Sequence, residues 1–170
     1  MFKFNKIILS VILAATLAQA ESKEAKDIEV YAKEVQQDNG DAIINDGVVV
    51  EYDGSIFRAD RAKYSFDKKY LNLSGNVTLI DKSGKRIRAK ELRLDLGDNS
   101  VILKDFFTLA QEHIWFSSTK GSKKEQLITS KNALFSSCSV DNPDWMLGFN
   151  KAIYDTETEI VRFYDAKVYI

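Results

Sequence analysis

After residue 20 the chain alternates apolar and polar residues in short segments, which turn signals separate from one another. Such turns read DGS at 53–55, SGK at 83–85 and GDNS at 97–100. Gly, Asn and Asp tolerate the positive φ angles that tight hairpins require. Period-two alternation interrupted by these turns is typical of antiparallel β-sheets. The pattern therefore predicts an all-β fold, built as a sandwich, a barrel or a solenoid.

The segments also resemble one another, and the first of two shared patterns is apolar-x-Ala-polar-polar-apolar-x-apolar. It occurs at residues 30–37, 57–64 and 87–94, with weaker copies at 128–135 and 147–154. The starts of the three stronger copies lie 27 and 30 residues apart. A recurrence of this length indicates an internal structural repeat.

A second pattern, apolar-x-Asp/Gly-x-apolar-x-apolar, lies between the copies of the first. It occurs at residues 44–50, 73–79 and 103–109, with starts 29 and 30 residues apart. Two strand types therefore alternate with a period near 30, which is typical of stacked repeat architectures.

The first pattern predicts a bent strand. In its clearest copy the apolar positions are Ile87, Ala89, Leu92 and Leu94. Because successive side chains of a flat strand point to opposite faces, the change of parity between Ala89 and Leu92 requires a bulge or corner. Strands that bend in register would form stacked V shapes around one apolar interior, with Lys90 outside. Such a stack leaves an open strand edge at each end, where another sheet can pair.

Charge and candidate chemistry argue against most enzyme classes. The chain has 24 Lys and Arg residues and 25 Asp and Glu residues, so no basic surface for nucleic acid is expected. His113 is the only histidine, and no GxSxG motif or phosphate loop occurs. One histidine cannot build a metal-binding cluster, and it is weak support for a catalytic triad. We therefore expect no enzymatic activity, no metal and no cofactor.

Aromatic residues gather around Phe106, Phe107, Trp115 and Phe116. They fit ordinary core packing, and they also fit an apolar lining for lipid chains, which needs little precise polar chemistry. The residues alone leave both interpretations open.

The first twenty residues have the three parts of a secretory signal peptide. Lys3 and Lys6 precede an apolar run at 7–17, and Ala-Gln-Ala follows at 18–20. The run is too short to span a bilayer as a helix, which disfavours the alternative of a membrane anchor. We expect export and a mature domain at 21–170. Disulfides form in exported compartments, so the lone Cys138 indicates either an external partner or a free thiol.

Two stretches resemble a known family. The stretch LSGNVTLIDKSGKRIRAKELRLD at 73–95 is similar to the OstA-like repeat of periplasmic lipopolysaccharide-transport proteins. The tail at 135–170, with Ser-Ser-Cys at 136–138 and Asp-Trp at 144–145, resembles the end of the N-terminal periplasmic domain in the LPS-assembly (LptD) family. The long C-terminal barrel of that family is absent from this chain, which is then either a fragment of a longer protein or a barrel-less relative.

The resemblance implies a β-taco, or twisted jelly-roll, of stacked V-shaped antiparallel strands. It implies a non-enzymatic role in the periplasm or at the periplasmic face of the outer membrane, passing lipopolysaccharide acyl chains along an apolar groove toward a membrane barrel. The implied partners are lipopolysaccharide, the bridge protein LptA through strand-edge pairing, and the outer-membrane barrel with LptE. It further implies that Cys138 forms a disulfide with the barrel that this chain lacks.

We expect the groove to be lined by inward positions of the two patterns. These residues are Val48, Val50, Phe57, Ala59, Val77, Leu79, Ile87, Ala89, Leu92, Leu94, Phe107 and Leu109. Photo-crosslinking groups at Val77 or Leu92 should then capture lipopolysaccharide, and one at Lys90 should not. Two alternatives remain: a soluble LptA-like bridge or chaperone, and a structural module that assembles edge to edge without lipid.

Overall fold

The computed structural model describes residues 28–111 and 113–170, which form one antiparallel sheet of 14 strands. The strands are β1 (Ile28–Ala32), β2 (Gln36–Asp38), β3 (Asp41–Ile44), β4 (Val48–Tyr52), β5 (Ser55–Ala59), β6 (Arg61–Ser65), β7 (Tyr70–Ile80), β8 (Arg86–Asp95), β9 (Val101–Gln111), β10 (Ile114–Lys124), β11 (Leu127–Ser136), β12 (Met146–Asp155), β13 (Ile160–Tyr164) and β14 (Lys167–Tyr169). No helix occurs in these ranges, so the all-β prediction is confirmed. The predicted signal peptide lies outside the described residues.

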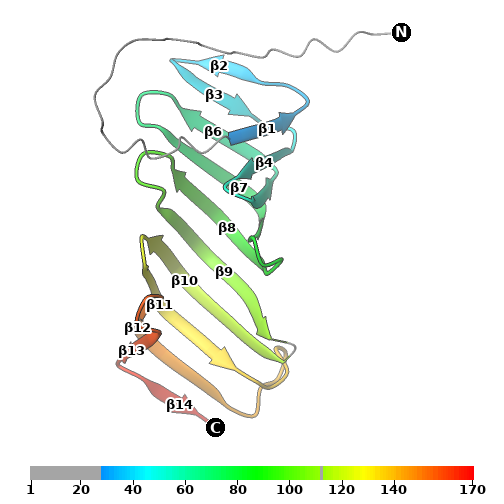
Figure 1. Cartoon of the computed structure of the whole chain (residues 1–170). Helices are drawn as coiled ribbons and strands as arrows, with labels where there is room; N and C mark the ends of the chain where they lie inside the picture. Colours follow the sequence, from blue (N-terminus) through cyan, green and yellow to red (C-terminus); the bar gives the residue numbers. More distant parts are fainter. Residues whose placement is uncertain (1–27, 112) are drawn as a thin grey trace, which may run out of the picture.

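The sheet is folded along its length into two arms. Arm I contains β1, β4, β5 and β14, and arm II contains β2, β3, β6 and β13. The long strands β7 to β12 run through both arms, so each bends once where the arms meet. We call the line of bends the corner and the free ends of the arms lip I and lip II. The strands stack from β1–β3 at one end of the molecule to β13–β14 at the other (Figure 1).

Glycine, Asn and Asp residues form the corner. Gly75, Asn76, Asp105 and Asn132 all have positive φ angles, between 45° and 76°. The pairing of β7 with β8 shifts register between Ser74 and Val77, next to the positions where the sequence predicted the bend. Backbone bending at these residues keeps the apolar side chains of both arms on the inner face.

Replacing Gly75 with alanine should destabilise the corner. Gly75 has a φ of 76°, and an added Cβ would lie 2.6 Å from a carboxylate oxygen of Asp60. We expect Gly75→Ala to lower the free energy of unfolding in urea by about 2 kcal/mol, part of it from the left-handed backbone and part from the clash. Gly84→Ala is the matched control, because Gly84 has a φ of 82° but open space around it. Equal losses in the two variants would contradict a corner that is packed against Asp60.

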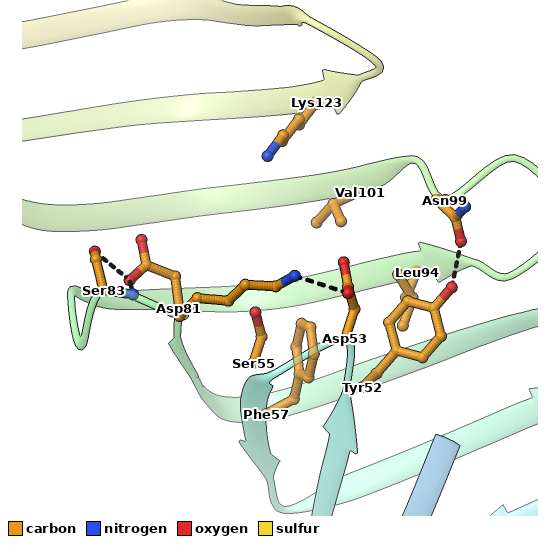
Figure 2. Close-up of a pocket in the computed structure, with 11 residues that line it drawn as sticks. Tyr52, Asp53, Ser55, Phe57, Asp81, Ser83, Leu94, Asn99, Val101 and Lys123 are labelled. Atoms are coloured by element: carbon orange, nitrogen blue, oxygen red, sulfur yellow. Dashed lines mark hydrogen bonds and ion pairs between the residues drawn. The ribbon is translucent and has the colours of Figure 1, made fainter. Parts of the chain in front are cut away.

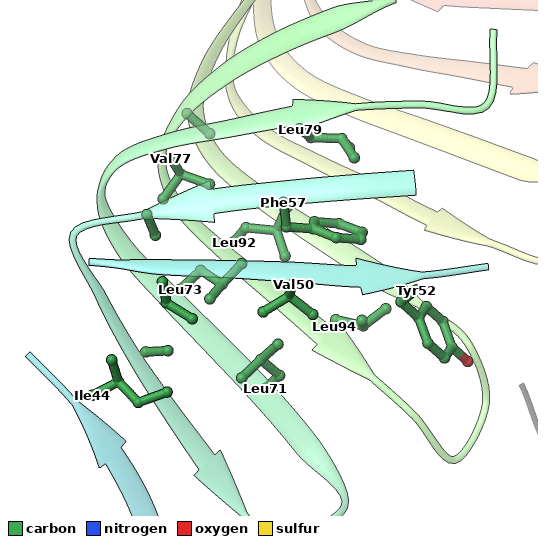
Figure 3. Close-up of a cluster of buried hydrophobic side chains, with 14 of the residues drawn as sticks. Ile44, Val50, Tyr52, Phe57, Leu71, Leu73, Val77, Leu79, Leu92 and Leu94 are labelled. Carbon is green, nitrogen blue, oxygen red and sulfur yellow. The ribbon is translucent and has the colours of Figure 1, made fainter. Parts of the chain in front are cut away.

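A cluster of buried side chains that runs from β3 to β9 fills one part of the interior. Val50, Leu73, Val77, Leu92 and Leu94 are each at most 2% exposed and belong to one cluster of buried side chains. The cluster joins residues of both arms (Figure 3). Burial of these side chains stabilises the fold through the hydrophobic effect.

Candidate functional site

An apolar cavity of about 660 Å³ lies between the arms, from β5 to β13. Its depth comes from one inward-facing row of side chains beside the corner on arm II. Paired positions in adjacent strands share a face of the sheet, so the register defines this row. From β7 to β12 the row reads Leu73, Leu92, Leu103, Gly121, Ser130 and Ala152. Gly121 has no side chain, and the ring of Phe106 packs over it, so closely that an added Cβ would lie 2.6 Å from the ring. Leu103, Gly121, Ser130 and Ala152 of this row line the cavity.

Aromatic rings follow one side of the cavity. The ring of Phe116 lies 5.7 Å from that of Phe106 and 6.0 Å from that of Phe149, measured between centroids. Phe149 in turn makes an edge contact with Phe163 at 4.9 Å. Ile128 lies in the lining as well. A concave apolar surface with few polar groups suits an extended hydrocarbon chain.

A side-chain contact joins the two lips where the hollow begins. The Tyr52 hydroxyl, at the end of β4 on lip I, donates a hydrogen bond to the Asn99 side chain in the β8–β9 turn on lip II (Figure 2). A smaller pocket of about 320 Å³ adjoins this contact and shares Phe57 and Val101 with the main cavity. The Tyr52–Asn99 contact closes the interior on the β3–β8 side, and the lips are apart beyond it.

Removing the Tyr52 hydroxyl should loosen the joined lips. We expect Tyr52→Phe to lower the free energy of unfolding by about 1 kcal/mol, because the ring stays buried while the hydrogen bond to Asn99 is lost. We also expect faster amide hydrogen exchange in the β4–β5 and β8–β9 turns. Tyr64→Phe is a suitable control, since Tyr64 is partly buried against the same core. Unchanged exchange in both turns would show that the contact does not hold the lips together.

Charged residues occur at the mouth of the cavity. Lys82 pairs with Asp53 at 2.7 Å. Burial raises the pKa of Asp81, but hydrogen bonds from the Ser83 hydroxyl and from the Lys85 and Ser83 amides outweigh it, so this pKa lies below its ordinary value. Asp81 therefore stays ionised, and its charge is engaged with its own turn (Figure 2).

The twelve residues that the sequence assigned to a groove lie in different parts of the structure. Phe57, Leu79 and Ile87 line the cavity, and Phe57 and Leu79 also belong to the buried cluster. Seven lie instead in the filled cluster, where side chains already occupy the space: Val48, Val50, Ala59, Val77, Ala89, Leu92 and Leu94. Of these seven, Leu94 also borders the smaller pocket. The interior of the described residues is thus hollow over only part of its length.

Phe107 and Leu109 require a correction, because they face away from the interior. Leu109 is 52% exposed, and the inward positions of β9 beyond the bend are Phe106 and Thr108. Three residues separate the inward Leu73 from Val77 in β7, but only two separate Leu103 from Phe106 in β9. The repeat alignment assumed that the corners of β7 and β9 contain the same number of residues. The difference of one residue reverses the face of every side chain that follows the corner in β9.

Other cavity residues were missed, although the weaker repeat copies carry a signal for them. Ser130 lines the cavity and occupies the position in the copy at 128–135 where the stronger copies have Ala. The two weaker copies, at 128–135 and 147–154, supply these residues to the lining: Ile128, Ser130, Phe135, Leu147, Phe149, Ala152 and Tyr154.

Cys138 lies in the loop between β11 and β12 and is half-buried with a free thiol. Its backbone is held on both sides: the amide donates to the Ser136 hydroxyl at 2.9 Å, and the carbonyl accepts from the Trp115 indole at 3.0 Å. The Ser136 hydroxyl donates to the carbonyl of Trp145 at 2.7 Å. These bonds fix the loop over the outer face of the sheet, and the described residues offer no second thiol.

The chain is similar to known proteins in sequence and in structure. The chain is 28% identical over 116 residues to the LPS-assembly protein LptD of Cupriavidus metallidurans, an alignment that covers 64% of this chain and 13% of that protein. The crystal structure of LptH is similar at 15% identity with a TM-score of 0.44, covering 85% of this chain and 95% of that one. LptH is the LptA-homologous periplasmic component of the lipopolysaccharide transport device of Pseudomonas aeruginosa. No protein-family model matches the chain.

Residues 28–111 and 113–170 contain neither a candidate membrane-spanning helix nor a candidate metal-binding cluster. Within these ranges no helix is long and apolar enough to cross a membrane. The same residues contain no group of three or more His, Cys, Asp or Glu side chains that could hold a metal ion.

Proposed function

We propose that this protein is a non-enzymatic component of lipopolysaccharide transport that holds acyl chains in the cavity between β5 and β13. The observation that carries the proposal is an apolar cavity of about 660 Å³ inside a folded sheet. The similarity to an LPS-assembly protein supports lipopolysaccharide as the lipid. Each methylene moved from water into such a surface contributes about 0.8 kcal/mol, so several chains can be held without any covalent step.

The buried cluster around Leu73 and Leu92 blocks part of the path that the sequence predicts for the lipid. Leu73 and Leu92 close the interior between the arms, and the Tyr52–Asn99 contact closes the lips beside them. We propose that acyl chains enter sideways between the lips beyond Asn99 and move toward β13 and β14. A path along the whole interior, as the repeat pattern alone suggests, would require the cluster around Leu92 to separate.

The ends of the stack support pairing with other sheets. At one end the inward-facing Val30 is 46% exposed, and at the other Phe163 and Val168 are 49% and 64% exposed. These residues lack the next strand that covers their counterparts within the stack. We propose that a bridge protein of the LptA type adds a strand at one edge, extending both the sheet and its apolar interior.

We further propose a role of the LptD type, in the periplasm or at the periplasmic face of the outer membrane, with a barrel and LptE as partners. The alignment with LptD and the fixed loop around Cys138 support this choice over a soluble LptA-like bridge. The Cys138 thiol would then form a disulfide with the barrel, which is not part of this chain.

Non-reducing electrophoresis of cell extracts tests the disulfide. We expect Cys138 to run in a larger, reducible species, and Cys138→Ser to abolish that species without changing the fold, because the hydrogen bonds at this residue come from its backbone. Ser137→Cys, one residue earlier on the same loop, is the control for accidental oxidation. A monomeric, fully alkylatable Cys138 in cells would contradict the pairing.

Bound lipid tests the transport role. We expect the chain, purified from cells that make lipopolysaccharide, to retain its lipid A portion in amounts approaching one molecule per chain by mass spectrometry. The competing function is a structural module that joins sheets edge to edge, which the exposed edges and the filled half would also allow. Purification without lipid, together with failure to bind added lipopolysaccharide, would favour that module.

A further inference from the structure

The inward-facing row along lip II contains one charged residue. From β8 to β13 this row reads Leu94, Val101, Lys123, Ile128, Tyr154 and Val161. Inward positions of a half-buried sheet are normally apolar, because the outer face of the strand carries the charge. Lys123 is exposed and lines both the main cavity and the smaller pocket, so its ammonium group is at the mouth rather than in the depth (Figure 2).

A second lysine stands on the opposite lip. Lys85, at the end of the β7–β8 turn on lip I, lines the same cavity. The lysines nearby are engaged: Lys82 pairs with Asp53, and Lys124 with Asp98 at 2.8 Å. Neither Lys85 nor Lys123 has an ion pair among the described residues. Two available cations therefore flank an apolar cavity.

The remaining charge at the mouth is Asp81, which also lines the cavity. One of its oxygens accepts hydrogen bonds from the Ser83 amide, the Ser83 hydroxyl and the Lys85 amide. The attraction between Asp81 and the Lys85 charge also contributes to the lowered pKa of Asp81. The two do not form an ion pair, so the ammonium group of Lys85, like that of Lys123, keeps its hydrogen-bond donors available. An anion between the lips would meet these donors first.

We propose that Lys85 and Lys123 bind the phosphate of an amphiphile whose acyl chain lies in the cavity. This inference rests on the proposed lipid-binding function and specifies the headgroup chemistry of the same site. The lysines bind phosphate as point charges, and the cavity supplies the apolar contact. The site then recognises the headgroup and the acyl chain together. The charges of the two lysines keep the phosphate end of the amphiphile at the water-exposed mouth.

Calorimetric titration with a matched pair of lipids tests the proposal. The probes are a monoacylglycerol phosphate and the monoacylglycerol of the same chain length, with inorganic phosphate as a third arm. We expect the intact chain to bind the phosphorylated lipid about tenfold more tightly, as two exposed charge contacts would give. In the Lys85→Gln, Lys123→Gln double variant this preference should disappear, while affinity for the uncharged lipid stays the same.

The control is the double variant Lys90→Gln, Lys120→Gln, which removes the same charge from exposed positions at the corner. It should keep the preference. Equal binding of the two lipids by the intact chain, or a preference that survives in the Lys85 and Lys123 variant, would overturn the phosphate site but leave the lipid cavity standing. Binding of neither lipid would overturn the cavity and the phosphate site together. Binding of inorganic phosphate to these lysines with equal affinity would show a free-anion site and overturn the proposal.

Discussion

Replacing Ser130 with leucine is expected to lower the affinity of the cavity for acyl chains by about thirtyfold. Ser130 lies on the cavity floor between Gly121 and Ala152, so a leucine side chain has room to extend into the hollow. Excluding two or three methylenes from the site costs the ligand about 2 kcal/mol. Binding of a fluorescent fatty-acid reporter, displaced by lipopolysaccharide, measures the change.

Because Ser130 is 7% exposed, the larger side chain also costs some stability, and binding is compared at a temperature where the variant is folded. Thr129→Leu is the matched control: Thr129 is the preceding residue of β11 and faces the other side of the sheet. It should leave lipid affinity unchanged. Loss of binding in both variants would point to a general disturbance of β11 and not to a blocked cavity.

Leu92→Ala is expected to destabilise the protein by about 3 kcal/mol. Leu92 is 1% exposed and packs in the filled cluster between the arms, so truncation leaves an enclosed void as well as losing apolar contact. For a chain of this size we expect the melting temperature to fall by about 6–12 °C. Lipid affinity at a temperature where the variant is folded should hardly change.

Ile128→Ala is the contrasting variant, because Ile128 lines the open cavity and is only partly buried. Its removal enlarges an existing hollow and creates no enclosed one, so the loss of stability should be less than half that of Leu92→Ala. Its effect should appear in lipid affinity instead. Similar stability losses in the two variants would mean that the two halves of the interior are packed alike.

Much of the fold could be predicted from period and parity. The change of parity between Ala89 and Leu92 located the corner, because only a bent strand keeps both residues inside. The alternation of two strand types anticipated a stack with open edges, and the exposed β1 and β13 occupy those edges.

The site was harder to predict, because a repeat pattern says which side chains face inward but not whether they meet. Val50 and Leu94 match the pattern as well as Ile128 does, yet their neighbours fill the space around them. Whether a row is hollow depends on the summed side-chain volume of both arms at one level. At Gly121, for example, the ring of Phe106 from the other arm takes the space that a side chain would occupy. The predicted inward orientation of Phe107 was wrong for a related reason. The corner of β9 has one residue fewer, which leaves the alternation along the strand intact but reverses which of its side chains face inward.

Site-specific photo-crosslinking in cells that make lipopolysaccharide tests the central claim most directly. The probes are placed at Ile128 and Phe135 in the cavity, at Leu92 in the filled half, and at Thr129 on the outer face. We predict lipopolysaccharide adducts at Ile128 and Phe135 and none at Leu92 or Thr129. Adducts at Leu92 as strong as those at Ile128 would contradict a half-filled interior, and adducts at none of the four positions would contradict lipid transport through this sheet.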